Sequence, residues 1–176
     1  LSAVLSLEEP CDLDRLFRLA YEVKTRSVGR LVRFRGLVEV GNVCVKDCLY
    51  CGIRKSNRNV RRYSMPRGEI LSLVEAARKA RFGSVVLQGG ERSDPAFVDE
   101  IEAILREIRR RSGGALGVTL SLGEQSSETL RRWRDAGATR YLLRVETTSP
   151  ELYAKIHPPE TTLADRIAAL KRIQDA

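Results

Sequence analysis

The sequence predicts an α/β protein made of four strand-then-helix units, corresponding to about half of a TIM-type (β/α) barrel. Apolar runs at residues 37–43, 84–88, 116–122 and 139–146 read as strands, and amphipathic helix patterns separate them. Such alternation is typical of a parallel sheet with right-handed crossovers. A complete eight-unit barrel typically needs about 250 residues, whereas this chain has 176.

Two architectures fit four such units: a partial barrel and a small doubly wound domain. An open four-stranded sheet would leave two bare edges, which favour association with other strands. The chain begins at Leu1 rather than Met and stops within a helical pattern at Ala176. We therefore expect the N-terminal half of a barrel rather than a complete small domain.

The first part of the chain is expected to be a helical segment that precedes the barrel. Apolar side chains recur at helical spacing over residues 12–28, and Gly29 follows as a plausible stop. We divide the chain into an N-terminal helical segment, residues 1–30, and the barrel half, residues 31–176. Cys11, at the start of the helix, is expected to be an ordinary free thiol.

The later helices have start or stop signals in the sequence. Asp94 precedes Pro95, which combines a capping carboxylate with proline at the first helical position. Thr162 and Asp165 resemble a capping box for the last helix. The expected helices cover residues 66–81, 94–108 and 126–136, the last closed by Gly137, followed by a short helix opening at Ser149-Pro150 and one that begins after Thr162.

The composition excludes some classes of protein and leaves others open. With 43% hydrophobic residues, the chain can form a packed core. No apolar run reaches the roughly 18 residues of a membrane-spanning helix, and no basic-then-apolar leader precedes the first helix, so we expect a cytoplasmic protein. The 31 Lys and Arg exceed the 23 Asp and Glu, giving a net charge of +8. That charge permits an anionic partner but does not separate nucleic acid from a phosphate or carboxylate ligand.

Three cysteines lie close together on the loop that leaves the first predicted strand. Cys44, Cys48 and Cys51 fall within eight residues, and in a reducing compartment such clustering indicates metal or redox chemistry rather than disulfides. Three thiolates can hold one cubane 4Fe–4S cluster and leave its fourth iron open to a small molecule. A structural zinc site needs four ligands, and Cys11 or His157 could supply the fourth. A zinc-binding module and a ferredoxin-like electron carrier therefore remain alternatives.

Polar segments follow each of the four predicted strands. The cysteines come after the first strand, residues 88–91 after the second, residues 121–124 after the third, and Arg144 with Glu146 stand at the end of the fourth. In parallel barrels the carboxyl ends of the strands carry the active site. Arg144 and Glu146 are two residues apart, so on a strand they would share a face, either lining the site or forming a mutual ion pair.

The cysteine motif, with the aromatic Tyr50 just before its last cysteine, resembles that of radical S-adenosylmethionine (SAM) enzymes. Together with residues 42–54, 87–91, 121–124 and 140–147, it resembles the HydE-type maturases of the biotin synthase-like group. The resemblance runs from about residue 12 to 176 but covers only about half of such an enzyme. It implies a 4Fe–4S cluster that cleaves SAM to a 5′-deoxyadenosyl radical, in the assembly of the diiron centre of FeFe hydrogenase.

The resemblance also implies roles for individual residues. The segment 89–91 would meet the amino group of SAM through backbone carbonyls, Arg144 and Arg166 would bind its carboxylate, and Glu146 would accept from its ribose or amine. The family usually has Ser in place of Gly89 and tends to carry Arg where His157 stands. No catalytic residue is expected beyond the cluster and SAM. The expected cofactor contacts are Tyr50, Gly89, Gly90, Glu91, Ser121, Arg144, Glu146 and Arg166, and the expected substrate contacts are Thr119 and His157.

The implied partners are a small-molecule or iron-complex substrate, a one-electron donor and other hydrogenase maturases. A different biotin synthase-like enzyme, acting on another small molecule or on RNA, is the main alternative. Six cations between Arg54 and Arg67 could form an RNA-binding strip, but Tyr63 is the only aromatic ring among them. A stacking platform for bases is therefore poor, and we expect neither a nucleic acid nor a membrane as partner.

Overall fold

The computed structural model describes residues 2–176, and contacts divide the chain into two units, Leu1–Arg33 and Phe34–Ala176. The first unit contains α1 (Ser2–Leu5), which the sequence did not predict, and α2 (Pro10–Val28), which confirms the expected helix. Helix α2 begins with proline in its first turn and ends at Gly29, whose φ of 71° favours glycine. Its apolar side chains are not buried in this structure.

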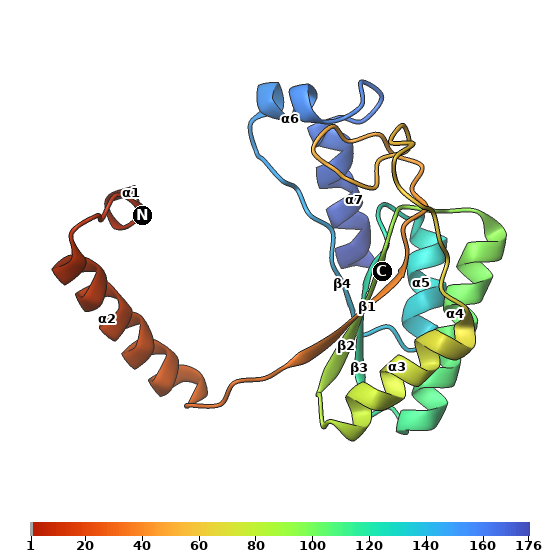
Figure 1. The fold of residues 1–176 in the computed structure, drawn as a ribbon, viewed down its shortest axis with the longest axis horizontal. Helices are drawn as coiled ribbons and strands as arrows, with labels where there is room; N and C mark the ends of the chain where they lie inside the picture. Colours follow the sequence, from red (N-terminus) through yellow and green to blue (C-terminus); the bar gives the residue numbers. More distant parts are fainter. Residues whose placement is uncertain (1) are drawn as a thin grey trace. The chain divides into compact units, whose positions relative to one another are not determined.

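The second unit is built on a parallel sheet in the order β1-β2-β3-β4 (Figure 1). This order confirms the predicted run of strand-then-helix units. Both β1 and β4 lie at edges of the sheet. The strands are β1 (Arg35–Gly41), β2 (Ser84–Gly89), β3 (Gly117–Ser121) and β4 (Arg140–Tyr141).

The helices α3 (Arg67–Lys79), α4 (Pro95–Ser112) and α5 (Ser127–Ala136) cover one face of this sheet, as Figure 1 shows. Two more helices, α6 (Pro150–Ile156) and α7 (Leu163–Asp175), follow β4. The predicted helix starts are confirmed by hydrogen bonds: the caps of α4 and α6 accept from backbone amides, and α7 has a complete capping box. None of the described helices is long and apolar enough to cross a membrane.

The core lies between the sheet and its helices. Val85, Leu87 and Leu120 alternate with less buried residues along their strands and are completely buried, as is Ile104 of α4. On the opposite face Leu37 is 60% exposed. Because side chains alternate along a strand, one face of the sheet forms the core. The other face is open at Leu37 of the edge strand β1, although Thr119 of β3 on that face is buried.

The fourth strand is much shorter than predicted. Only Arg140 and Tyr141 pair with β3, and the last ladder bond runs from the Leu142 amide to the Leu120 carbonyl at 2.8 Å. Beyond it the backbone is irregular, and Glu146 has a φ of 68°, which a strand residue does not adopt. The fourth strand predicted over residues 139–146 is therefore present but ends at Tyr141, and the argument that Arg144 and Glu146 share a strand face does not hold.

Candidate functional site

A cavity of about 130 Å³ opens at the carboxyl end of the sheet. Segments that follow all four strands line it, as expected for a parallel barrel. Of the cluster ligands, cofactor contacts and substrate contacts expected from the sequence, only Thr119 and His157 are absent from its lining. The predicted residues that line it are Cys44, Cys48, Tyr50, Cys51, Gly89, Gly90, Glu91, Ser121, Arg144, Glu146 and Arg166.

The three cavity cysteines are free thiols, each partly buried. The first half of their loop is held by the segment after β2: the Val45 amide donates to the Glu91 carbonyl at 3.0 Å, and the Glu91 amide donates to Cys44 Sγ at 3.4 Å. Burial raises the pKa of the Cys48 thiol. A bound metal cation would lower this pKa again, because it stabilises the negative charge of the thiolate, the form that binds metals.

The second half of the cysteine loop is fastened by Arg62. Its guanidinium donates to the carbonyl oxygens of Asn42 at 2.6 Å, Ile53 at 2.8 Å and Arg54 at 2.6 Å. A fourth bond reaches the Asn57 carbonyl at 3.2 Å. The sequence analysis counted Arg62 in a basic run, and nothing in the local pattern distinguished this inward-facing arginine from its neighbours.

Two other cations of that run also have partners within the protein. Arg67 forms an ion pair with Glu100 of α4, and Arg54 donates to the Cys51 carbonyl at 3.2 Å. With Arg62, three of the six cations are therefore engaged in the fold. This arrangement weakens the case for an RNA-binding strip, which needs the cations directed to solvent.

Gly90 allows the close approach of two backbone segments. A Cβ built on Gly90 would overlap the Val43 carbonyl and lie 2.8 Å from Cys44 Cβ. The resemblance assigned Gly90 to SAM through its backbone, and the structure shows that the missing side chain is also needed for contact with the cysteine loop. Gly123, with a φ of 79°, makes room for the Glu91 side chain in the same way.

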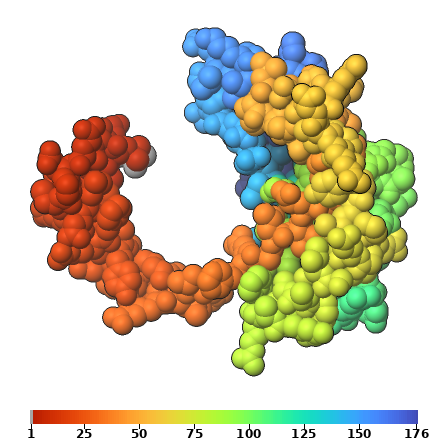
Figure 2. Space-filling model, in the orientation of Figure 1, coloured from red at the N-terminus to blue at the C-terminus, as the bar shows by residue number. Residues whose placement is uncertain are grey.

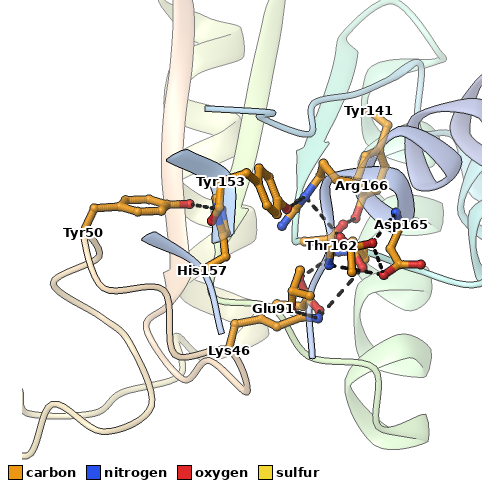
Figure 3. Close-up of polar contacts among 12 residues, drawn as sticks. Lys46, Tyr50, Glu91, Tyr141, Tyr153, His157, Thr162, Asp165 and Arg166 are labelled. Carbon is orange, nitrogen blue, oxygen red and sulfur yellow. Dashed lines mark hydrogen bonds and ion pairs between the residues drawn. The ribbon is translucent and has the colours of Figure 1, made fainter. Parts of the chain in front are cut away.

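A cluster of charged residues forms part of the cavity wall (Figure 3). Lys46, between the first two cysteines, lies 3.6 Å from a Glu91 oxygen and 3.9 Å from a Glu124 oxygen. Glu91 also accepts from the Glu124 amide at 3.0 Å. Burial raises the pKa of Glu91, while this hydrogen bond and Lys46 oppose the rise. The sequence analysis named Glu124 only as the end of the segment 121–124 and did not single out Lys46, since their pairing depends on contacts distant in the chain.

Arg166 is positioned at the start of α7 and is only 6% exposed. Its Nε donates to the Tyr153 hydroxyl at 3.2 Å and lies 3.1 Å from a Glu124 oxygen. The two terminal nitrogens make no hydrogen bond to any residue described by the structure, and the side chain lines the cavity. Arg166 can therefore offer two parallel donors to an anionic group.

Arg144 and Glu146 form an ion pair, with 3.3 Å between Nε and Oε1. The mutual ion pair considered from the sequence is therefore present, but it is not buried, because the Arg144 side chain is 72% exposed. Such an exposed pair contributes little to stability. Both residues line the cavity and remain free to exchange this contact for one with a ligand.

The two predicted substrate contacts lie away from the cavity lining. Thr119, on β3, is buried, and its hydroxyl has no hydrogen-bond partner among residues 2–176. His157, which caps the C-terminal end of α6, is 3% exposed and contacts Tyr50 and Tyr153. The predicted role of these two residues in substrate binding stays a prediction.

The donor set fits an iron–sulfur cluster better than a single ion. Within the part of the chain that the structure describes, no group of three or more His, Cys, Asp or Glu side chains is close enough to hold one metal ion. A tetrahedral zinc site needs four such ligands around one centre, so the geometry does not favour a zinc-binding module. In a cubane cluster each thiolate binds a different iron, and three separated thiols around one cavity suit that arrangement.

Comparison with known proteins assigns the family. The family model described as the Radical SAM superfamily matches residues 38–176. The chain belongs to the radical SAM superfamily. Membership implies a 4Fe–4S cluster and SAM as cofactors, and the three cavity cysteines and the charged groups around them are residues that suit both.

Among curated proteins, the chain is 42% identical over 179 residues to the [FeFe] hydrogenase maturase subunit HydE of Thermotoga maritima, matching 99% of this chain and 49% of that protein. It is 29% identical over 157 residues to 3-methylornithine synthase of Methanosarcina acetivorans, matching 89% of this chain and 44% of that protein. The chain thus spans about half the length of the curated relatives it matches.

Solved structures show the same fold. Methylornithine synthase (PylB) matches with a TM-score of 0.88 at 25% identity, covering 99% of this chain and 51% of that one. The FeFe-hydrogenase maturase HydG from Carboxydothermus hydrogenoformans matches with a TM-score of 0.83 at 23% identity, covering 98% and 40%. These matches confirm the partial (β/α) barrel expected from the sequence.

Proposed function

We propose that this chain provides the cluster-binding and SAM-binding part of a radical SAM enzyme that matures the diiron centre of FeFe hydrogenase. The observation that carries the proposal is the single cavity in which the three cysteines meet the segments after β2, β3 and β4. The likeness to the curated HydE of Thermotoga maritima supports the choice of reaction.

Cys44, Cys48 and Cys51 are proposed to hold a 4Fe–4S cluster. When bound, the cluster would supply the electron that splits SAM into methionine and a 5′-deoxyadenosyl radical. The protein around it fixes the three thiols: Arg62 holds one side of their loop, and the segment after β2 holds the other.

The cations of the cavity are proposed to bind the carboxylate of SAM. Arg166 offers its two terminal nitrogens from a buried position, and Arg144 reaches the cavity from the segment after β4. Bonds from guanidinium to carboxylate are charge-assisted and among the stronger hydrogen bonds in proteins. Glu146 is assigned to the ribose or amine of SAM, and Tyr50, Ser121 and the backbone of residues 89–91 to the remaining contacts.

The substrate is proposed to be a small molecule or an iron complex, with Thr119 among its contacts. The buried hydroxyl of Thr119 lacks a partner in the described chain, and a buried polar group without one is costly. A one-electron donor and other hydrogenase maturases are the proposed partners. For the chain as a whole we propose an N-terminal helical segment, residues 1–30, and a half barrel, residues 31–176, whose open sheet face and edge strands are available to further strands.

The experiment is SAM cleavage by the full-length protein, reconstituted anaerobically with iron and sulfide and then reduced. We expect 5′-deoxyadenosine and methionine in equal amounts, and activation of FeFe hydrogenase when the protein is added to the other maturation components. Release of 5′-deoxyadenosine without hydrogenase activation would favour a different biotin synthase-like enzyme. Absence of SAM cleavage in an iron-loaded protein would contradict the proposal as a whole.

A further inference from the structure

We infer that His157 is a positioning residue: it holds the Tyr50 side chain so that the tyrosine ring forms one wall of the cysteine cavity. The Tyr50 hydroxyl oxygen lies 3.2 Å from His157 Nε2, and the two rings meet edge to face with centroids 5.3 Å apart. Tyr50 lines the cavity, whereas His157 lies behind it. The inference rests on the proposed function, because it concerns how the SAM site is shaped.

The orientation of His157 is fixed from its other side. Nδ1 lies 3.1 Å from the Tyr153 carbonyl oxygen, and since a carbonyl can only accept, Nδ1 must carry the proton. In the neutral ring Nε2 is then the acceptor, and the Tyr50 hydroxyl donates to it. The imidazole also stacks on the Tyr153 ring at a centroid distance of 3.7 Å and an interplanar angle of 11°.

Tyr153 also contacts Arg166, one of the cations proposed to bind SAM. Tyr153 is almost fully buried, and its hydroxyl accepts from Arg166 Nε at 3.2 Å (Figure 3). His157 and Arg166 therefore contact the same tyrosine from opposite ends. Tyr153 thus supports both His157, which contacts the Tyr50 ring, and Arg166, which is proposed to bind the SAM carboxylate.

The Tyr50 hydroxyl also lies near the Cys48 thiol, but the tyrosine ring itself is partly open to solvent and depends on His157 for its orientation. The residue is 46% exposed, and a tyrosine ring on an exposed loop is free to change rotamer. The backbone around Tyr50 is held by a turn, in which the Cys51 amide donates to the Cys48 carbonyl at 3.0 Å, and the Leu49 amide donates to the Ile156 carbonyl at 2.9 Å, which joins the loop to the end of α6 next to His157. Figure 2 shows this meeting of the orange cysteine loop and the blue C-terminal segment.

The experiment is a double-mutant cycle on SAM affinity in the full-length, cluster-loaded protein. Tyr50→Phe removes the hydroxyl, and His157→Phe keeps a stacking ring but removes the acceptor. Each change is expected to weaken SAM binding about three- to tenfold, the effect of one hydrogen bond. Because both remove the same bond, the double variant is expected to bind no more weakly than either single variant, at unchanged iron content.

Two amides provide a matched comparison. His157→Gln places an amide near the position of Nε2 and is expected to recover part of the affinity, whereas His157→Asn places it near Nδ1 and is not. As a second readout, nitrogen-15 NMR of labelled histidine, with the cluster in its diamagnetic oxidised state, is expected to show the Nδ1–H tautomer. The signal is assigned by its loss in His157→Gln, and its Nε2 frequency is expected to shift in Tyr50→Phe.

The inference is overturned if His157→Phe binds SAM normally, if the effects of the two single changes multiply in the double variant, or if the Nε2 frequency ignores Tyr50→Phe. If a His157 variant fails to load iron, its SAM affinity is not informative. The shift of the Nε2 frequency between wild type and Tyr50→Phe then decides whether the hydrogen bond is present. If the iron-loaded wild type does not bind SAM, the proposed function fails and the inference fails with it. If the wild type binds SAM and His157→Phe binds it equally well, the inference is contradicted but the proposed function is not.

Discussion

The helix-covered face of the sheet and the cavity at its carboxyl end are held together by different kinds of contact. Val85, Leu87 and Leu120 are completely buried on the covered face against the apolar side of α4. At the cavity, Lys46 pairs with two carboxylates, and Arg62 binds four carbonyl oxygens. Buried apolar area stabilises in proportion to its size, whereas each polar contact depends on its partner. Substitutions on the covered face should therefore mainly lower the free energy of unfolding. Substitutions at the cavity should mainly lower iron loading or SAM affinity.

The largest effect is expected when a cavity cysteine is replaced by alanine. Losing Cys44, Cys48 or Cys51 removes one of only three thiolate ligands, so cluster binding should be abolished in each variant. Cys11→Ala is the matched control, because Cys11 is exposed in α2, outside the sheet unit. The measurement is iron per chain after anaerobic reconstitution of the full-length protein. Full iron loading in any of the three variants would remove that cysteine from the site.

The second largest effect is expected when a buried core residue of α4 is truncated. Ile104→Ala leaves a cavity between α4 and the sheet, where Ile104 is completely buried, and should destabilise the protein by about 2–5 kcal/mol. Denaturant unfolding measures the loss. The folded fraction of this variant should still bind cluster and SAM, since Ile104 does not line the cysteine cavity. A selective loss of SAM binding without loss of stability would break the distinction between the two regions.

The third prediction concerns the exposed cation of the cavity. Arg144→Ala removes a charge-assisted contact worth about 1.5–3 kcal/mol, so SAM affinity should fall about ten- to hundredfold. Stability should barely change, because the ion pair with Glu146 is mostly exposed. Lys171→Ala in α7 is the control: it removes the same charge from an exposed site outside the cavity. Equal SAM affinity in the two variants would exclude Arg144 from the SAM site.

The smallest of these effects is expected for a methyl group added at Gly90. Gly90→Ala forces the Val43–Cys44 backbone away from the segment after β2, and such overpacking typically costs about 1–3 kcal/mol. Gly68→Ala is the control, because Gly68 lies in α3 with no atom within 4 Å of the added carbon. Alanine there should stabilise the helix slightly. Iron loading and unfolding are measured for both; if Gly90→Ala loads iron and unfolds like wild type, the close approach is not needed.

The elements most faithfully predicted are those defined by local pattern and local hydrogen bonds. The capping box of Thr162 and Asp165 forms as expected, and so does the Asp94 cap. The fourth strand was overestimated because its apolar residues suit a strand, whereas its actual length depends on pairing. It pairs with β3 over two residues only, and the positive φ of Glu146 cannot be read from a pattern.

The cavity was partly predictable for the same reason. Its cysteines and the segments after the strands are short motifs at strand ends, so the parallel fold alone brings them together. The contacts of Lys46 and His157 join segments far apart in the chain. Those of Arg62 are mostly local, but no periodicity indicates which cation of the basic run turns inward. The cations of a basic run usually face solvent, and the sequence does not show that Arg62 is the one that turns inward.

The central claim is that one cavity binds an iron–sulfur cluster and SAM together, and one measurement tests it most directly. The full-length protein is reconstituted anaerobically and reduced, and its iron content and electron paramagnetic resonance spectrum are recorded before and after SAM is added. The account predicts about four irons per chain and a signal that changes with SAM in the wild type but needs much more SAM in Arg144→Ala. Stoichiometric zinc without iron, or a cluster signal that SAM leaves unchanged, would contradict it.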